Sequence, residues 1–276
     1  MEKMRTIFLM GGLVLLFMYV GNLVAGEQGM MMALLLACGI NFFSYFFSDK
    51  VVLSQYRAKE VTQASAPQLY EIVKRLSRQA QLPMPRVYII PEAAPNAFAT
   101  GRNPQHAAVA ATQGLLDLMS AEEIEGVLAH EMSHVKHYDI LIGTVAAVFA
   151  GAIGMLANFA KTGSTAQNRR GNGAALLVGS LLMPLAATII QMAISRRREY
   201  RADEGAAYLT RHPEWLMSAL SKLEGYSKNY QMKKVAPQTA HLFIVDPISG
   251  ALAGLFKTHP STADRIKRLQ EIKQQL

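Results

Sequence analysis

The sequence predicts a mainly helical α+β fold with two transmembrane helical hairpins. Four long apolar runs occur along the 276 residues, arranged in two pairs. Short segments rich in β-branched and aromatic residues lie between the pairs, and much of the remaining polar sequence has the apolar spacing of helices. A hydrophobic content of 51% fits a soluble domain of ordinary size joined to several membrane spans.

The first apolar run covers residues 7–25 and contains no charged residue. At a rise of ~1.5 Å per residue, about 19 residues can cross a hydrocarbon core of ~30 Å. A cleaved signal peptide is the alternative, because Lys3 and Arg5 resemble its basic start. The apolar stretch is too long for that reading, and a second run follows at once at residues 29–47. Residues 1–50 therefore form the first predicted hairpin.

The second pair of apolar runs covers residues 140–160 and 174–194 and predicts a hairpin over residues 140–194. Runs rich in Gly and Ala also form buried core helices or dip partway into a bilayer, so full spanning stays open. Basic residues flank both hairpins on their outer sides, with arginines at 196–198 and 201 after the last run. This bias predicts that the N-terminus and the large polar segments face the cytoplasm.

The net charge of +8 would suit nucleic acid, but the basic residues cluster at the edges of the apolar runs. There they anchor the cytoplasmic face of a membrane protein, so we expect a lipid bilayer and no nucleic acid among the partners. The single cysteine, Cys38, lies within an apolar run. It excludes an intrachain disulfide and a metal site built from cysteines.

The polar segment between the hairpins predicts one helix followed by three short strands. The helix covers residues 65–83, and the strands cover 86–90, 96–100 and 106–112, with the last two in hairpin relation. Residues 120–139 then form a helix, because Ser120 and Glu123 have the spacing of a capping box. After the second hairpin, helices are expected at 197–209, at 213–228, and from Pro260 onward with proline in the first turn.

The segment AHEMSHVKHYD, residues 129–139, carries the first chemical signal. His130 and His134 are four apart on a helix, so both point the same way and can bind one tetrahedral metal ion. Glu131 lies about 100° from His130 around the helix axis, where it reaches a water on the metal rather than the metal itself. This is the general-base geometry of zinc peptidases, and a purely structural zinc site would have no use for Glu131.

A catalytic zinc site needs a third protein ligand and one open position. Ile140 stands where metzincins have their third histidine, which excludes that class. His137 lies on nearly the same helix face, but three consecutive turns of one helix cannot surround a tetrahedral ion, and its role stays open. Glu199 is the better candidate, with Asp203 four residues later to accept the outer N–H of a liganding imidazole. The alternative is a solvated helix whose acids pair with nearby arginines.

Together, HEMSH at 130–134, EYRAD at 199–203 and the order of the apolar runs resemble the HtpX-type membrane zinc metalloproteases, relatives of the CAAX prenyl endopeptidases. The resemblance covers essentially the whole chain. It implies that one zinc ion per chain is held by His130, His134 and Glu199. It further implies that Glu131 is the catalytic base and that Asp203 supports a liganding imidazole.

The same resemblance implies a zincin-like metallopeptidase domain assembled from residues 51–139 and 195–276. Within it, PNAFATG at 95–101 is similar to the family's edge strand, whose backbone pairs with an extended substrate. THPSTADRI at 258–266 resembles a late His-Pro segment, which implies that His259 stabilises the oxyanion near the metal. The implied substrate-binding residues are Asn96, Ala97, Phe98 and Ala99. An ordinary strand and a surface histidine are the alternatives.

The function implied by the resemblance is an endopeptidase of the bacterial inner membrane. Its N-terminus and catalytic domain would face the cytoplasm, and its substrates would be polypeptides, namely damaged or misfolded membrane proteins under stress. An intramembrane-cleaving metalloprotease is one alternative, against which the charged residues around HEMSH argue. A non-catalytic membrane scaffold with a metal site is the second alternative, but in such a protein Glu131 would have no role. The sequence does not specify the cleavage preference or the oligomeric state.

Overall fold

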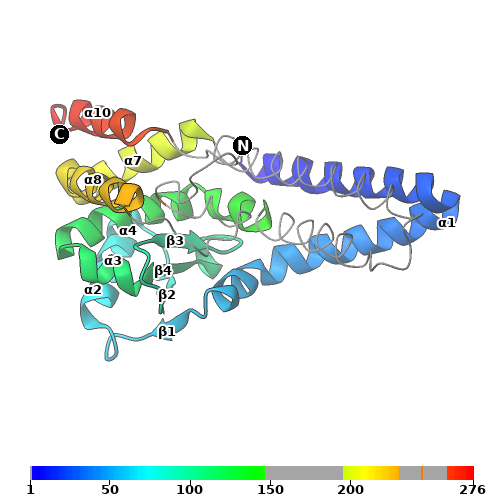
Figure 1. Ribbon diagram of the computed structural model, residues 1–276, viewed down its shortest axis with the longest axis horizontal. Helices are drawn as coiled ribbons and strands as arrows, with labels where there is room; N and C mark the ends of the chain where they lie inside the picture. The colour runs from blue at the N-terminus through cyan, green and yellow to red at the C-terminus, as the bar shows by residue number, and fades with distance from the viewer. Residues whose placement is uncertain (1, 147–194, 230–243, 245–259) are drawn as a thin grey trace.

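The computed structural model describes residues 2–146, 195–229, 244 and 260–276. Over these residues the chain forms a long helical arm and a domain in which helices pack around a four-stranded sheet (Figure 1). The predicted mainly helical α+β fold is confirmed for this part of the chain. The predicted hairpin at 140–194 lies outside the described residues except for 140–146, which are helical.

The arm is the helical element α1 (Glu2–Gln55), which reverses direction at Gly26. Gly26 has a φ of 61°, a conformation that glycine adopts at little cost. The two halves lie side by side after the reversal (Figure 1), so close that a methyl group on Gly21 would lie 2.4 Å from the Gly29 carbonyl oxygen. The first predicted hairpin, residues 1–50, falls on these two halves.

The surface of the arm is apolar. Phe8, Leu15, Met32 and Leu35 are each about 70% exposed, which suits lipid better than water. Within the described residues, Gly26–Gln55 is the segment long and apolar enough to cross a membrane, and a shorter apolar segment covers Thr6–Tyr19. The second half of α1 leads directly into the domain (Figure 1).

The sheet has the strand order β1-β2-β4-β3, which makes β3 an edge strand. Its strands are β1 (Lys59–Val61), β2 (Arg86–Ile90), β3 (Ala97–Thr100) and β4 (Ala108–Thr112). β3 and β4 pair antiparallel with Ala97 opposite Ala111, while β2 and β4 are parallel. The three predicted strands and the hairpin relation of the last two are confirmed. β1 was not predicted, because Lys-Glu-Val shows no apolar alternation; the strand exists through its pairing with β2.

Helix α4 lies at the centre of the domain and packs against α2, α7, α8 and β3. The described helices of the domain are α2 (Pro67–Ala80), α3 (Gln113–Leu118), α4 (Ala121–Lys136), α7 (Arg196–Thr210), α8 (Pro213–Asn229) and α10 (Thr262–Lys273), with a short 3-10 helix at Pro104–His106. Figure 1 shows α10 lying on α7 and α8 at the outer side of the domain. Because α4 is surrounded, most of its side chains are buried, and its polar residues need partners within the protein.

The capping box predicted for α4 is present. The Ser120 hydroxyl accepts the Glu123 N–H at 3.3 Å, and the Glu123 carboxylate accepts the Ser120 N–H at 2.8 Å. The same carboxylate accepts hydrogen bonds from Ser218 and Lys222 of α8. This cluster ties the start of α4 to α8.

The start of the last helix differs from the prediction. α10 begins at Thr262, and Pro260 precedes its cap instead of lying in its first turn. The physical reason is the Ser261 side chain, which accepts the Asp264 N–H at 3.1 Å and so caps the helix one residue after the proline.

Candidate metal centre

The structure brings the three predicted metal ligands together. His130 and His134 lie on successive turns of α4, with their Nε2 atoms 3.2 Å apart. Glu199, in the first turn of α7, places its carboxylate oxygens 3.6 Å from His130 Nε2 and 3.7 Å from His134 Nε2. One donor atom from each residue lies within 4.8 Å of the others. The close packing of α7 on α4 therefore builds the cluster.

The donor set fits a metal ion. Two imidazole nitrogens and one carboxylate oxygen are the ligands of one class of catalytic zinc site, which keeps a fourth position open. Each histidine also presents its Nδ1 atom to an aspartate, 2.9 Å away for His130 and 3.1 Å away for His134. Because a carboxylate only accepts hydrogen bonds, each Nδ1 carries a hydrogen, and each ring directs its Nε2 atom into the cluster, where it can bind a metal ion in place of a proton. The two inward-facing Nε2 atoms and the Glu199 carboxylate together fit a cation between them.

The two residues that hold the His130 ring, Asp203 and Arg265, are fully buried. Asp203 Oδ1 accepts from His130 Nδ1, and Arg265 of α10 donates to both Asp203 oxygens at 2.7 and 2.9 Å. Arg265 also donates to the carbonyl oxygen of Ile244 at 2.9 Å. His130, Asp203 and Arg265 are each 1% exposed. Burial alone would lower the pKa of His130, but its hydrogen bonds with Asp203 and Glu199 outweigh burial and raise that pKa to about 9.

The His134 ring is held by Asp139 and Arg201, and of these two residues the arginine is partly exposed. Asp139 Oδ2 lies 3.1 Å from His134 Nδ1, and Arg201 Nη2 donates to the two Asp139 oxygens at 2.9 and 3.2 Å. The His134 side chain is 16% exposed and that of Arg201 is 35% exposed. Each histidine is thus held by an aspartate that is in turn held by an arginine.

Glu131 lies beside the cluster without joining it. Its side chain is buried, and its Oε2 atom accepts the backbone N–H of Ala99 at 2.9 Å. Burial raises the pKa of Glu131 above its ordinary value, against the opposing effects of His130, His134 and the Ala99 amide. A carboxylate with a raised pKa is a stronger base than one in open solvent, which suits it to accept a proton.

The predicted substrate-binding residues lie on and next to β3. Ala97, Phe98 and Ala99 are all buried, and the Phe98 ring packs against Tyr56 at a centroid distance of 5.7 Å. Phe98 therefore belongs to the apolar cluster that joins the sheet to the end of α1. Asn96 is 2% exposed, and its Oδ1 atom accepts the Ile244 N–H at 3.3 Å.

Of the two other histidines that were considered for the site, the structure describes His137 but not His259. His259 lies outside the described residues, so its role as an oxyanion donor stays a prediction. His137 caps the end of α4 and donates from Nδ1 to the Ser133 carbonyl oxygen at 2.8 Å. Burial and the nearby Arg201 lower the pKa of His137. The contact fits a helix-end role for this ring.

Three residues of the site were missed by sequence reasoning, namely Asp139, Arg201 and Arg265. Asp139 lies five residues after His134, and Arg201 lies between Glu199 and Asp203, but no spacing rule within one helix links these two positions to the histidines. The spacing rules that found the histidines apply within one helix, whereas each of these three residues acts across two elements. Only the packing of α4, α7 and α10 reveals them.

Comparisons with known proteins agree with this geometry. Residues 63–273 match the model of Peptidase family M48. A protease HtpX homolog of Campylobacter curvus is 63% identical over 283 residues, covering 100% of this chain and 99% of the relative. A second, of Campylobacter hominis, is 62% identical over 282 residues and covers 100% of both chains.

The fold is also similar to a solved structure, the crystal structure of S. mikatae Ste24p. The TM-score is 0.54 at 16% sequence identity, and the match covers 97% of this chain and 65% of that chain. The resemblance to the HtpX-type proteases, inferred from HEMSH and EYRAD, is confirmed. The chain belongs to peptidase family M48 and is a metalloprotease.

Proposed function

We propose that this chain is an integral-membrane endopeptidase that depends on one zinc ion held by His130, His134 and Glu199. The observation that carries the proposal is the convergence of these three donors within 4.8 Å, with the Glu131 carboxylate beside them. Two nitrogen donors and one oxygen donor suit zinc better than the oxygen-seeking magnesium or calcium ions. Glu131 is close enough to serve the reaction and is not needed for the donor set.

The protein groups have separate roles in hydrolysis. When bound, a zinc ion supplies Lewis-acid chemistry that activates water and polarises a carbonyl group. Asp203 and Asp139 hold the two imidazole rings so that their Nε2 lone pairs face inward. Glu131 accepts a proton from the attacking water and later returns it to the leaving amine. The hydrogen bond from the Ala99 N–H fixes the orientation of Glu131, and burial raises the pKa of Glu131, which makes its carboxylate a stronger base.

The substrate peptide adds to the edge of the sheet along β3. Alternate residues of an edge strand direct their peptide groups outward, and the Ala99 N–H, which reaches Glu131, points away from β4. The backbone groups of Ala97 and the carbonyl group of Ala99 therefore face an extended substrate, whereas the Ala99 N–H binds Glu131 and Phe98 pairs with β4. In this proposal the substrate backbone lies next to Glu131, and Asn96 directly precedes the same strand.

We further propose that the chain resides in the bacterial inner membrane with its N-terminus and catalytic domain on the cytoplasmic side, where it removes damaged or misfolded membrane proteins. The exposed apolar surface of α1 and the similarity to HtpX homologs support the membrane location. The basic residues before and after the apolar runs support the orientation. The charged pairs around the metal site disfavour an active site within the bilayer, because exposed charges are costly in hydrocarbon.

The test uses the purified full-length chain in detergent with casein as substrate. We expect cleavage to stop with a chelator and to return with zinc. Glu131→Gln is expected to abolish cleavage while zinc stays bound, and Glu122→Gln, an exposed residue of the same helix, should leave both unchanged. Zinc binding without hydrolysis by the unmodified chain would favour the scaffold alternative. Undiminished cleavage by Glu131→Gln would show that the base is elsewhere.

A further inference from the structure

We propose that Asp139 and Arg201 form a positioning pair for His134, which orients that ring for the metal ion. The inference rests on the proposed zinc-dependent function. Asp203 was expected to support one liganding imidazole, and in the structure this ring is that of His130, with Asp203 Oδ1 2.9 Å from His130 Nδ1. His134 needs its own acceptor, and Asp139 provides it at 3.1 Å.

The geometry of the pair restricts the ring of His134. Arg201 Nη2 donates to both oxygens of Asp139, at 2.9 and 3.2 Å. One of these oxygens, Oδ2, also receives the hydrogen of His134 Nδ1. The Asp139 side chain is only 5% exposed, so it meets little competing water. The arginine thereby fixes the carboxylate, and the carboxylate fixes the tautomer and direction of the ring.

The backbone between the two residues is specially shaped for this contact. On a continuous helix, a residue five positions after His134 would lie about 140° away around the axis, too far to reach the ring. Instead α4 ends at Lys136, Tyr138 adopts a left-handed φ of 63°, and a new helical segment begins at residue 139. A left-handed conformation is unfavourable for a bulky residue such as tyrosine. The turn places the Asp139 carboxylate within hydrogen-bond distance of the His134 ring.

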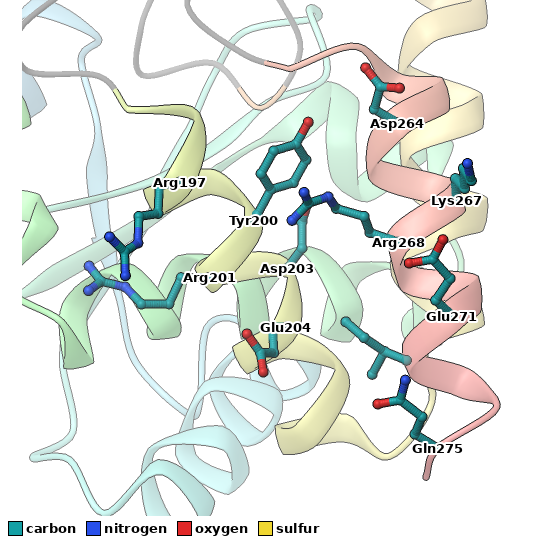
Figure 2. Close-up of a pocket in the computed structure, with 11 residues that line it drawn as sticks. Arg197, Tyr200, Arg201, Asp203, Glu204, Asp264, Lys267, Arg268, Glu271 and Gln275 are labelled. Atoms are coloured by element: carbon teal, nitrogen blue, oxygen red, sulfur yellow. The ribbon is translucent and has the colours of Figure 1, made fainter.

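The pair differs from Asp203 and Arg265 in its access to solvent. Arg201 borders a pocket of about 1060 Å³ between α7 and α10. Figure 2 shows its side chain directed away from α10, toward Arg197, whereas Asp203 lies on the α10 side of α7. Its side chain is 35% exposed, compared with 1% for Arg265. Substitution of Arg201, the accessible member of the pair, is therefore expected to disturb the metal site without unfolding the domain.

The experiment measures the zinc affinity of the full-length chain in detergent by competition with a chelating dye, together with the unfolding temperature of the zinc-free form. We expect Asp139→Ala to weaken zinc binding about 10–100-fold. Asp139→Asn keeps an oxygen that can accept from the ring, so it should lose less than Asp139→Ala. Arg201→Gln should lose less than Asp139→Ala as well, because the aspartate remains.

Asp49→Ala is the matched control. It removes a second Asp–Arg pair, in which Asp49 accepts from Arg86 at 2.7 Å, and the two side chains are 13% and 40% exposed. This control should change the unfolding temperature about as much as Asp139→Ala and leave zinc affinity unaltered. The inference is overturned if Asp139→Ala binds zinc as tightly as the unmodified chain, or if Asp49→Ala weakens binding equally.

A second readout covers the case in which Asp139→Ala does not fold. The visible spectrum of the cobalt-loaded chain reports the geometry of the ligands, and Asp139→Asn should alter it while Asp49→Asn should not. Identical cobalt spectra would overturn the inference. Failure of the proposed function would look different, because the unmodified chain itself would then bind no zinc or would bind zinc without cleaving casein.

Discussion

Gly205 of α7 packs directly on Ser133 of α4, so closely that a methyl group at position 205 would lie 2.2 Å from Ser133 Oγ and 2.9 Å from Ser133 Cβ. Ser133 lies between the two histidines of α4, and Gly205 lies two residues after Asp203 on α7. The contact therefore sets the spacing between the helix that carries two predicted ligands and the helix that carries the third. Carbon atoms do not persist at such distances, so any larger residue must push α7 away.

Gly205→Ala is expected to destabilise the chain by about 1–3 kcal/mol, the usual cost of overpacking a core. Helix propensity alone predicts the opposite, a gain of up to about 1 kcal/mol for replacing glycine by alanine. Gly225→Ala on α8 is the matched control, because nothing lies within 4 Å of a methyl group there. Urea unfolding in detergent and zinc competition measure the two effects. Equal stability of the two variants would show that α4 and α7 do not need this close contact.

Glu199→Ala is expected to remove zinc binding more completely than the loss of any supporting residue. Its carboxylate is the donor that α7 contributes to the cluster, and two histidines of one helix cannot hold the ion as tightly. Glu204→Ala, an exposed residue one turn later on the same helix, should bind zinc normally. Zinc content after dialysis against a weak chelator provides the measurement. Retention of a full equivalent by Glu199→Ala would exclude this residue as the third ligand.

Arg265→Met is expected to cost about 3–5 kcal/mol of stability, because it leaves the carboxylate of Asp203 buried without its cation. Replacing both partners, with Asp203→Leu added, should cost less than Arg265→Met alone. Arg268→Met one turn later is the control, since Arg268 is exposed and stacks on the Tyr200 ring at 3.8 Å, a contact worth about 1 kcal/mol or less. Urea unfolding of the zinc-free chains compares them. Similar costs for positions 265 and 268 would mean that the buried ion pair contributes little.

Much of the fold could be predicted because its elements carry local signals. The capping box at Ser120 and Glu123 marks the start of α4, and the run RVYII marks β2. β1 carries no such signal, since two of the three residues in Lys59–Val61 are charged. Its strand conformation comes from pairing with β2, a contact between segments more than twenty residues apart. Start and end points of helices depend on single caps, which is why α10 begins later than expected.

The residues of the metal site also differ in whether the local sequence predicts them. His130 and His134 could be predicted because their spacing within one helix already places them on one face. Glu199 required a second motif, and its approach to the histidines depends on how α7 packs on α4. Asp139 was not found, because its contact requires a left-handed tyrosine at position 138, and nothing in the local sequence favours that conformation for tyrosine.

The acid sensitivity of α4 follows from Glu123. Burial raises the pKa of this carboxyl, but the hydrogen bonds from Lys222, Ser218 and the Ser120 backbone outweigh burial and lower the pKa below its ordinary value of 4.5. Because the folded-state pKa is depressed, the unfolded chain takes up the proton first as pH falls. The stabilising contribution of Glu123 is therefore complete above pH 4.5 and is lost as pH falls through the lower folded-state pKa.

Comparison with Glu123→Gln isolates this effect from the other carboxylates. At pH 7 the variant should be less stable than the unmodified chain by about 1 kcal/mol, the usual value of a helix cap. The difference should shrink between pH 4.5 and pH 3, as measured by urea unfolding in detergent at each pH. Glu71→Gln, which removes an exposed pair with Lys74, should show little difference at any pH. A difference for Glu123→Gln that stays constant from pH 7 to pH 3 would mean that the charge at this position does not stabilise α4.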